Sequence, residues 1–484
     1  MPLRRFERVE NVLKEITPKS QDYSQWYVDV IKKADMVDYA PIKGFMVIKP
    51  YGYRIWEFIQ DAMNREFRAT GHENAYFPLL IPENLLLREA QHVEGFSPEV
   101  AWVTIGGGEP LAEKLAVRPT SETIIGAMYS KWIQSYRDLP VLMNQWSNVV
   151  RWEKATRPFL RTTEFLWQEG HTVHRSAQEA EQETMQQLEI YRQVIEGELA
   201  IPVVAGRKSA GERFAGAVET YTLEALMGDG RALQIATSHF LGQNFAKAFD
   251  IQYLDEDGVR KYGWTTSWGA STRMIGGLIM VHGDDKGLRM PPRVAPIQVV
   301  IVPIAKGKDA DAVLAYAKQV ADELAGEFRV RVDDRPEFTP GYKYNDWEMR
   351  GVPIRLEVGP RDMANQSVML ARRDTGEKTP VAAAGIVETI RQRLDDIQHT
   401  LFQQALEHQK SHTVVVENYR QTEEYGYRGF FEGDWCGREA CADQLKEATG
   451  MTIRCLPLNR KPLNTGCVVC GQPSTERMLF ARAY

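Results

Sequence analysis

The sequence predicts an α+β protein of three successive domains, and three observations carry that prediction. Up to about residue 290, amphipathic helical stretches mix with short apolar runs bounded by Gly and Pro, which is typical of a mainly antiparallel sheet with helices. After a proline cluster the pattern changes to a regular alternation of strands and helices. All five cysteines then lie beyond residue 435. A chain of 484 residues has ample apolar material for more than one core.

The first domain is expected over residues 1–290. Residues 53–68 have a helical pattern, and residues 75–80 form a short strand-like run that ends before Pro82. Residues 179–198 are rich in Gln and Glu, with apolar side chains at helical spacing, and they predict a surface helix.

The second domain is expected over residues 295–396, after prolines 291, 292 and 296. Its pattern predicts a βαβαβ unit with a mostly parallel sheet. The predicted elements are strand 297–304, helix 310–328, strand 330–332, helix 342–350 and strand 354–358. The third domain is expected over residues 397–484. A charged helix over 385–410 spans its beginning, and a strand at 413–417 precedes the cysteines.

Composition narrows the functional classes. Hydrophobic residues make up 43% and charged residues 26%, and no apolar run approaches the roughly 20 residues that cross a bilayer. The amino terminus has basic residues without a following apolar stretch, so we expect a cytoplasmic protein without a membrane span. A net charge of −6 argues against general nucleic-acid binding, so any nucleic-acid partner requires local basic patches.

The cysteines predict a metal site. Two close pairs, Cys436 with Cys441 and Cys467 with Cys470, have glycines beside them and can converge on one tetrahedral Zn²⁺. Four protein ligands would close the coordination sphere, so the zinc would be structural. Free thiols or two local disulfides are the alternatives, and Cys455 lies outside the pairs.

A cluster of charged residues marks the first domain. From Asn148 the chain runs NVVRWEKATRPFLRTTEFLWQEGHT. Alternation predicts that Arg151 and Glu153 share one strand face and that Phe165, Trp167 and Glu169 share a face of the next strand. Such a charged floor is costly in a half-buried sheet unless a ligand compensates it, although a solvated hairpin with ordinary ion pairs is an equal alternative from this segment alone.

This segment resembles motif 2 of the class II aminoacyl-tRNA synthetases, in particular the prolyl-tRNA synthetase family. Pro78 lies in a segment that resembles motif 1, and SerThrArgMetIleGlyGly over residues 271–277 resembles motif 3. The run VRPTSET with Thr120, Ser121 and Glu122 matches the family's amino-acid-binding loop, and QIATSHFLGQNFAKAF from Gln234 matches another signature. The resemblance covers essentially the whole chain, including the cysteine-bearing tail of the archaeal and eukaryotic type and of some bacteria.

The resemblance implies a ligase that activates L-proline with ATP, releases pyrophosphate, and transfers proline to tRNA(Pro). It implies a class II antiparallel-sheet catalytic domain, an α/β anticodon-binding domain and a small α+β zinc-binding C-terminal domain, assembled as a homodimer through motif 1. Activation is an in-line attack by a carboxylate on the α-phosphate, so fixed positive charge and alignment are the main catalytic means.

The family pattern assigns roles to residues around ATP. Arg151 would bridge the proline carboxylate and the α-phosphate, and Arg273 would hold the far phosphates. Gln234 would help to hold Mg²⁺. The remaining ATP-binding residues implied by the resemblance are Glu153, Arg161, Thr162, Phe165, Thr237 and Ser271.

The pattern also assigns a proline pocket. Thr120 and Glu122 would receive the secondary ammonium, and the loop 96–99 would close over bound proline. The pocket walls implied by the resemblance are Trp167, Glu169, His171, Phe214, His239 and Ser267. Taken singly, the two histidines and the two aromatic residues are typical of an ordinary core.

The second domain resembles the anticodon-binding domain of several class II enzymes, and Glu348, Arg350, Glu357 and Arg361 are candidates for contacts with anticodon bases. A solvated charged face is the alternative for each of them. The roughly 100 residues between motifs 2 and 3 match no editing insertion, so we expect no editing in cis and some activation of alanine or cysteine. The sequence ends in Tyr484, as some members of the family do, and in those members the terminal carboxylate packs toward the active site.

Two other functions were compared with this one. A threonyl, glycyl or histidyl enzyme of the same subclass would share motifs 2 and 3 but would lack the TSE loop and the cysteine pattern. A non-enzymatic tRNA-binding module would have lost Arg151 or Arg273, and both are present.

Overall fold

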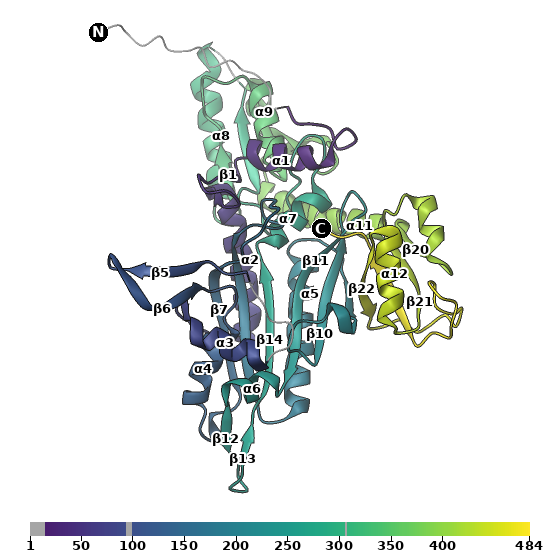
Figure 1. Cartoon of the computed structure of the whole chain (residues 1–484). Coiled ribbons are helices and arrows are strands. Elements are labelled where there is room, and N and C mark those ends of the chain that lie inside the picture. Colours follow the sequence, from purple (N-terminus) through teal and green to yellow (C-terminus); the bar gives the residue numbers. More distant parts are fainter. Residues whose placement is uncertain (1–14, 93–98, 305–306) are drawn as a thin grey trace.

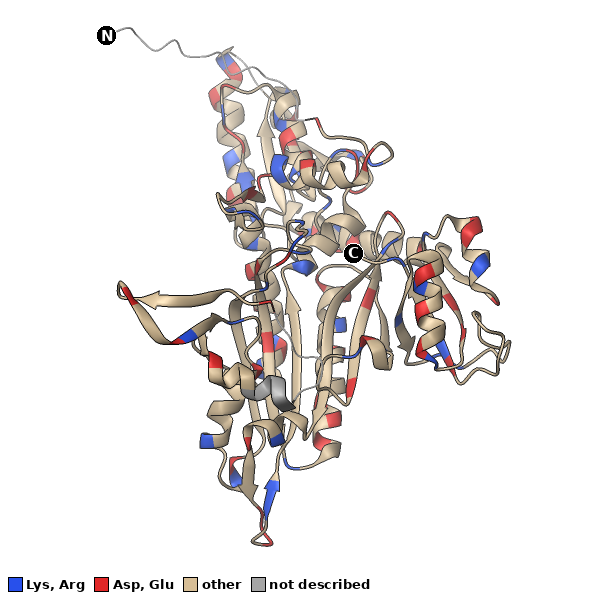
Figure 2. Ribbon diagram, in the orientation of Figure 1, with Lys and Arg blue, Asp and Glu red and all other residues tan. Residues whose placement is uncertain are grey.

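The computed structural model describes residues 15–92, 99–304 and 307–484. Figure 1 shows a tall central sheet, an α/β part above it that contains α8 and α9, and a smaller part at its side that contains α12. Figure 2 shows acidic and basic residues interspersed along the ribbons of all three parts. Within the described residues, no helix is long and apolar enough to cross a membrane.

The central sheet is mainly antiparallel, as predicted. The strands from the first 290 residues run in the order β9-β10-β11-β14-β8-β7-β3, and only the short β3–β7 pair among them is parallel. The strands are β3 (Glu73–Asn74), β7 (Val141–Val150), β8 (Glu164–His174), β9 (Val204–Arg207), β10 (Glu219–Leu226), β11 (Ala232–Gly242) and β14 (Trp264–Ser271).

One face of this sheet is covered by α5 (Ala177–Gly197), which packs against β8, β10, β11 and β14. The helix begins at Ser176, whose hydroxyl accepts from Glu179 N while the Glu179 carboxylate accepts from Ser176 N, a capping box. Leu188, Tyr191 and Ile195 lie on one side of the helix and are buried, so the predicted amphipathic helix is confirmed and its apolar side faces the sheet.

A second layer lies outside α5. Helix α2 (Pro50–Ala69) packs on α5 and begins with Pro50, whose missing N–H costs nothing in the first helical turn. Trp26, Trp56 and Trp268 lie in the largest core cluster. The first 290 residues, called the catalytic part below, also form α1 (Tyr23–Lys33), α3 (Glu83–His92), α4 (Glu122–Trp132), α6 (Asn244–Phe249) and α7 (Arg273–His282).

The predicted strand at 75–80 is wrong for most of its length. Residues 75–79 form no strand, and only β4 (Leu80–Pro82) follows them. Ala75 N donates to Asn144 O, and Phe77 N donates to the side-chain oxygen of Gln145. The apolar run is therefore held irregularly against β7 rather than in a ladder.

Three small sheet elements project from this core. β4 pairs with β6 (Glu109–Val117), which forms a protruding hairpin with β5 (Trp102–Gly106). The hairpin turns at Gly107 and Gly108, both with positive φ, as a tight two-residue turn requires. The remaining pairs are β1 (Val37–Tyr39) with β2 (Met46–Ile48) and β12 (Gln252–Leu254) with β13 (Arg260–Tyr262).

The second part has the predicted βαβαβ order, and its sheet runs β16-β15-β17-β18-β19. The first three strands are parallel, but β18 and β19 are antiparallel, so the sheet is more mixed than predicted. Its elements are β15 (Val299–Pro303), α8 (Ala310–Leu324), β16 (Val330–Val332), α9 (Pro340–Met349), β17 (Ile354–Val358), α10 (Pro360–Ala364), β18 (Ser367–Arg372) and β19 (Lys378–Ala382).

The C-terminal part joins the central sheet directly. Its β22 pairs antiparallel with β9, so that eleven strands form one sheet from β20 to β3. Gly206 permits this junction, because a Cβ there would lie 2.4 Å from Cys455 Sγ. Helix α11 (Ile386–Ser411) leads into this part, and its buried side chains Ile386, Ile390 and Leu394 belong to the core of the second part. The elements of the C-terminal part are β20 (Thr413–Val415), β21 (Phe430–Trp435), α12 (Glu439–Thr449), β22 (Thr452–Pro457) and β23 (Glu476–Ala481).

Candidate active site

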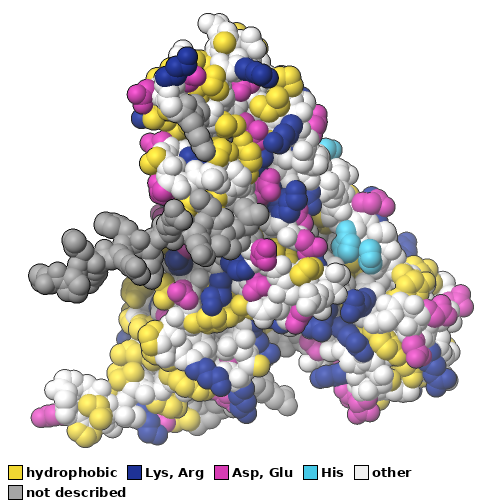
Figure 3. Space-filling model, turned by 90° about the horizontal axis from the view of Figure 1, so that it is seen from above, with side chains coloured by type: hydrophobic (Ala, Val, Ile, Leu, Met, Phe, Trp, Pro, Cys, Tyr) yellow, Lys and Arg dark blue, Asp and Glu magenta, His cyan; other side chains and the backbone are white. Residues whose placement is uncertain are grey.

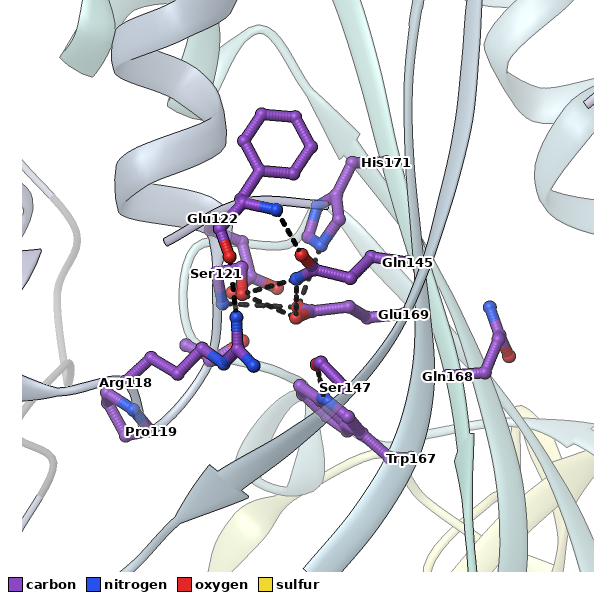
Figure 4. A network of polar contacts seen from close by, with 12 residues as sticks. Arg118, Pro119, Ser121, Glu122, Gln145, Ser147, Trp167, Gln168, Glu169 and His171 are labelled. Carbon is purple, nitrogen blue, oxygen red and sulfur yellow. Dashed lines mark hydrogen bonds and ion pairs between the residues drawn. The ribbon is translucent and has the colours of Figure 1, made fainter. Parts of the chain in front are cut away.

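A cavity of about 290 Å³ opens on the face of the central sheet opposite α5. Strand alternation decides which side chains reach it. Glu169 lines the cavity, whereas Gln168 accepts from Tyr191 Oη of α5 at 2.6 Å and points to the opposite face (Figure 4). On β11, Ser238 Oγ likewise donates to Thr184 O of α5, while its neighbours Thr237 and His239 line the cavity.

Strand register assembles the floor of this cavity from distant parts of the sequence. His171 of β8 lies opposite Ser267 of β14, Ser267 lies opposite His239 of β11, and His239 lies opposite Thr220 of β10. Directly paired residues share a face of the sheet, so these four side chains form one row. The row brings together three residues of the predicted proline pocket.

Glu169 is the centre of a buried hydrogen-bond network (Figure 4). One carboxylate oxygen accepts from Ser121 Oγ at 2.5 Å and Gln145 Nε2 at 2.9 Å. The other lies 3.1 Å from Ser121 N and 3.0 Å from His171 Nε2. Burial would raise the pKa of Glu169, but these hydrogen bonds, with that of His171 foremost, hold the pKa below its usual value.

The network fixes the TSE loop. Glu169 binds both the amide and the hydroxyl of Ser121, and Thr120 Oγ1 donates to Glu122, the first residue of α4. Glu122 is 8% exposed and lines the cavity. Burial would lower the pKa of His171, but the hydrogen bond to Glu169 and the charges of Glu122 and Glu169 outweigh it and raise the pKa. This end of the cavity is thus a cation-accepting one.

His239 differs from His171 in charge. Thr220 Oγ1 accepts from Phe214 N at 3.0 Å and lies 3.0 Å from His239 Nδ1, so its proton is available to that ring nitrogen. Burial and the neighbouring His171 lower the pKa of His239 to about 3. The neutral ring stacks on Phe214, with centroids 4.6 Å apart, and the pair forms an apolar wall.

Two arginines define the other end of the cavity. Arg151 Nε donates to Pro119 O at 2.9 Å, and its guanidinium lies 5.4 Å from the Phe165 ring centroid and 5.2 Å from that of Trp167. Arg273 begins α7 and donates to two backbone carbonyls, Leu160 O at 3.1 Å and Gln234 O at 3.4 Å.

No carboxylate among the described residues lies within ion-pairing distance of either guanidinium. Burial, reinforced by the charge of Arg151, lowers the pKa of Arg273 to about 10. Burial also lowers the pKa of Arg151, although the charges of Glu122, Glu169 and Glu153 act in the opposite direction. Two buried guanidiniums that line one cavity without a direct ion-pair partner form a site for an anion.

The predicted strand position of Arg151 and Glu153 is wrong, because β7 ends at Val150. Arg151 N still bonds to Thr163 O, but the chain then leaves the sheet as a loop. In that loop Arg161 Nε donates to Glu153 Oε2 at 2.8 Å, and both residues line a neighbouring recess that also includes Arg151. Thr162 is buried and donates to Glu164 O rather than facing either recess.

Most of the sequence-predicted site residues therefore meet in one cavity. The predicted residues that line it are Thr120, Glu122, Arg151, Phe165, Trp167, Glu169, His171, Phe214, Gln234, Thr237, His239, Ser267, Ser271 and Arg273. Residues 96–98 of the predicted closing loop lie outside the described residues, and Glu99 lines the neighbouring recess.

Comparison with known proteins identifies this architecture. Residues 102–282 match the class II tRNA synthetase core domain of the glycyl, histidyl, prolyl, seryl and threonyl enzymes, and residues 298–393 match the anticodon-binding domain. The chain is 55% identical over 480 residues to the proline–tRNA ligase of Alkaliphilus oremlandii, covering 99% of this chain and 100% of that protein.

The chain belongs to the proline–tRNA ligase family. It is also 55% identical to proline–tRNA ligase 2 of Clostridioides difficile over 98% of both chains. The relative from Natranaerobius thermophilus is 54% identical over 98% of this chain and 99% of its own. The chain is thus an aminoacyl-tRNA synthetase with the predicted α+β fold.

Residues 422–484 match the C-terminal domain of prolyl-tRNA synthetases and contain the four-cysteine cluster. The four Sγ atoms lie within 4.8 Å of one another, with Cys436 Sγ 3.6 Å from Cys441 Sγ and 3.8 Å from Cys470 Sγ. Tetrahedral zinc with Zn–S bonds of about 2.3 Å separates its sulfurs by about 3.8 Å. The cluster therefore fits Zn²⁺, and the sulfurs are too far apart for disulfides.

In the anticodon-binding domain, two of the residues predicted to contact the anticodon, Glu348 and Glu357, both bind Arg355. Arg355 donates to Glu348 Oε1 at 3.1 Å and to Glu357 Oε1 at 3.0 Å. Arg350 faces the catalytic part instead, 3.6 Å from Asp35, and Arg361 is exposed on α10. A recess of about 150 Å³ beside Glu348 is lined by five basic side chains, from Lys286, Arg355, Arg372, Arg373 and Lys378.

Sequence reasoning missed three polar residues that line the main cavity, Lys208, Glu212 and Thr220. It also missed Gln145, which supports Glu169 from β7. These positions belong to no motif that the sequence analysis used. Strand register brings Thr220 and Gln145 to the site, and the segment that follows β9 brings Lys208 and Glu212. Alternation along β10 was the one available signal for Thr220.

Proposed function

We propose that this enzyme activates L-proline with ATP to prolyl-adenylate and transfers the prolyl group to the 3′ end of tRNA(Pro). The observation that carries the proposal is one cavity with a cation-accepting end, an apolar wall and an anion-binding end in line. A zwitterionic amino acid with a small ring, next to a triphosphate, has the complementary chemistry.

The anion-binding end supports a role for Arg151 and Arg273 as the catalytic residues. A carboxylate oxygen of proline attacks the α-phosphorus, a new P–O bond forms, and the bond to the pyrophosphate leaving group breaks. Arg151 has used only Nε in the described residues, so both terminal nitrogens can bridge the two reacting anions. Arg273 would hold the γ-phosphate, and both charges offset the repulsion between carboxylate and triphosphate.

The rest of the ATP site is assigned by position. Phe165 would stack on adenine, Glu153 would accept from the adenine amino group, and Arg161 and Thr162 would bracket the triphosphate. Thr237 and Ser271 would lie near the ribose. Gln234 has its amide oxygen available as one ligand of Mg²⁺, which prefers oxygen and binds mainly through phosphates in such sites. When bound, the ion neutralises phosphate charge.

The cation-accepting end is proposed to bind the secondary ammonium of proline. Glu122, with Thr120 bonded to it, would accept from the ammonium, and Glu169 would hold this loop in place through Ser121. Trp167, Phe214 and the neutral His239 would enclose the pyrrolidine ring, with His171 and Ser267 on the floor.

Discrimination against smaller amino acids is expected to be incomplete. A missing methylene changes binding by about 1–3 kcal/mol, so alanine and cysteine are expected to be activated as minor errors. Residues 175–263 supply α5, α6 and strands β9 to β13, and these elements belong to the catalytic part. This use of the segment supports the proposal that the chain has no editing domain in cis.

The partners proposed are tRNA(Pro) and a second copy of the chain, in the cytoplasm. Glu348, Arg350, Glu357 and Arg361, with the basic recess beside them, are the candidates for anticodon contacts. Large exposed apolar side chains support the dimer, namely Tyr76 at 71%, Leu87 at 55% and Ile105 at 61%. Figure 3 shows hydrophobic side chains gathered on the flank from which the β5–β6 hairpin protrudes.

The C-terminal cysteines are proposed to hold a structural Zn²⁺ through Cys436, Cys441, Cys467 and Cys470. With four protein ligands such a zinc has no position for substrate, so its contribution is to the fold of the C-terminal part.

The test is proline-dependent exchange of labelled pyrophosphate into ATP, followed by charging of tRNA(Pro). Strong exchange with proline, weak exchange with alanine and none with threonine or glycine is the expected result. Absence of exchange with every amino acid, in a folded and zinc-loaded preparation, would refute the proposal.

A further inference from the structure

The C-terminal part contributes a buried arginine to an ion-pair cluster that reaches the active-site cavity through Lys208. Arg454, on β22, is 8% exposed, and its Nε donates to Glu224 Oε2 at 3.0 Å while its Nη2 lies 3.3 Å from Glu224 Oε1. Glu224, on β10 of the catalytic part, has no exposed surface. The pair crosses from one part of the chain to the other at the place where β22 joins β9.

Lys208 connects this pair to the cavity. It lines the cavity, is 3% exposed, and its Nζ donates to Glu224 Oε1 at 3.0 Å and to the backbone carbonyl of Arg454 at 2.8 Å. Thr222 Oγ1 also donates to Glu224 Oε1 at 3.0 Å. Arg454 therefore supports the wall twice, through its guanidinium on Glu224 and through its carbonyl on Lys208.

Glu224 is also the carboxylate that acts electrostatically on Arg273. It lies opposite Gln234 in the strand register, and Gln234 accepts through its carbonyl from Arg273. The charge of Glu224 raises the pKa of Arg273, although no ion pair joins the two residues. Burial would raise the pKa of Glu224, but Lys208 and Arg454 outweigh it and keep the carboxylate ionised.

These contacts set two demands on Glu224. It must stay ionised inside the sheet, which requires cationic partners. It must also stay away from Arg273, because a direct ion pair would occupy the guanidinium that faces the cavity. The fork of Arg454 meets both demands, since it engages both carboxylate oxygens and does not itself line the cavity.

We propose that Arg454 is a positioning residue of the ATP half of the active site: it holds Glu224 so that Lys208 stays in the cavity wall and Arg273 stays free for the phosphates. The inference rests on the proposed function, because it concerns the same cavity. Nothing in the motifs of the catalytic part indicates this dependence on residue 454.

A second contact supports the same dependence. Gly211 N, in the loop that follows Lys208, donates to the Glu439 carboxylate at the start of α12. A Cβ at Gly211 would lie 2.6 Å from that carboxylate. The segment that carries Lys208 and Glu212 into the cavity lining therefore rests on the C-terminal part at two points.

The chain offers a matched control. Arg477 donates to Glu432 at 2.9 Å, Arg477 is 8% exposed and Glu432 is 1% exposed, and Arg460 lies 3.4 Å from Glu432 as a second cation. This arrangement resembles the Arg454–Glu224–Lys208 set, but none of its three residues lines the active-site cavity, whereas Lys208 of the first set does. Arg477→Met measures what loss of a buried ion pair does to the C-terminal part alone.

The experiment compares Arg454→Met, Arg454→Lys, Arg477→Met and the double variant Arg454→Met/Glu224→Gln in full-length, zinc-loaded protein. KM for ATP and for proline is measured by pyrophosphate exchange, and affinity for Mg²⁺–ATP is measured by equilibrium dialysis without proline. We expect Arg454→Met to raise the KM and the dissociation constant for ATP about tenfold, as loss of one charge-assisted contact permits, with proline KM changed less than about twofold.

Arg454→Lys should recover part of the loss, and the double variant should recover more, because it removes the carboxylate that competes for Arg273. Arg477→Met should leave ATP affinity unchanged. Equal effects of Arg454→Met and Arg477→Met, or a double variant worse than the single one, would overturn the proposal. Dialysis separates the role of Arg454 from the proposed function. If the wild type binds ATP but shows no proline-dependent exchange, the proposed function is refuted, and the ATP affinities of the variants still test the role of Arg454.

Discussion

Replacement of Arg151 by lysine is the most direct perturbation of the proposed chemistry. In the described residues the guanidinium makes one hydrogen bond to protein, through Nε to Pro119 O, which leaves the two terminal nitrogens for ligands. A lysine ammonium is a point donor and cannot bridge a carboxylate and a phosphate as a planar fork does. Two charge-assisted hydrogen bonds made in the transition state are therefore lost or weakened.

The magnitude follows from those two bonds. At about 1.5–3 kcal/mol for each hydrogen bond to a charged group, the loss is about 3–6 kcal/mol. Since each 1.36 kcal/mol corresponds to tenfold in rate, kcat/KM for pyrophosphate exchange should fall by about 10² to 10⁴. Stability should change little, because the substituted group makes one hydrogen bond to protein, a lysine can keep its charge near the Phe165 and Trp167 rings, and the group lies near the like charge of Arg273.

Arg118→Lys provides the contrast. Arg118 is 1% exposed, and its hydrogen bonds go to Asn148 O, Asn148 Oδ1 and Phe77 O. Its lysine variant should lower the thermal midpoint more than Arg151→Lys and lower kcat/KM less. If Arg151→Lys retains exchange within tenfold of wild type, or if the two variants lose stability and activity in the same proportion, then the bridging role of Arg151 is wrong.

Three further predictions address the cation-accepting end, the core beneath it and the cysteines. His171→Asn should lower the free energy of unfolding most below pH 6.5, and the difference from wild type should shrink as pH rises through the raised folded-state pKa of His171. Denaturant unfolding across pH 5–9 measures this difference. A difference that stays constant with pH would contradict the ion pair with Glu169. Gly170→Ala places a Cβ 2.1 Å from Cζ2 of Trp268, so unfolding free energy should fall by about 1–3 kcal/mol and proline KM should rise; an unchanged urea midpoint would show that Trp268 can move freely. Cys441→Ser should abolish stoichiometric zinc and lower the thermal midpoint by roughly 10 °C, whereas Cys455→Ala should retain zinc; metal analysis and calorimetry on both variants decide between the cluster and a set of free thiols.

The sequence predicted the site better than it predicted the backbone around it. Thr120, Glu169 and Arg273 were assigned through the resemblance of their motifs to the prolyl-tRNA synthetase family, and all three line one cavity. The end of β7 at Val150 was missed because alternation continues past it, while the chain turns away after a last bond to Thr163. Alternation cannot detect such an exit.

Non-local features lay beyond sequence reasoning for a different reason. The junction of β22 with β9 depends on the register of residues far apart in the chain, and neither Lys208 nor Arg454 belongs to a local pattern. The antiparallel β18 and β19 were missed because the preceding strand–helix alternation favoured a parallel continuation. In the first domain, the run at 75–79 has strand-like composition, but it makes one backbone hydrogen bond to β7, through Ala75 N, and the next donor, Phe77 N, bonds to the side chain of Gln145 instead of continuing a ladder.

The shared eleven-stranded sheet also has a consequence for solubility. If the chain stopped before β22, then β9 would become a bare edge strand, with the N–H and C=O groups of Gly206 and Arg207 open to another molecule. Its partner β10 is buried over most of its length, and a bare edge strand beside it would be a template for strand addition between copies. By covering this edge, β22 protects β9 against pairing with other molecules. Forms of this enzyme that lack β22 should therefore precipitate at concentrations at which the full chain stays in solution.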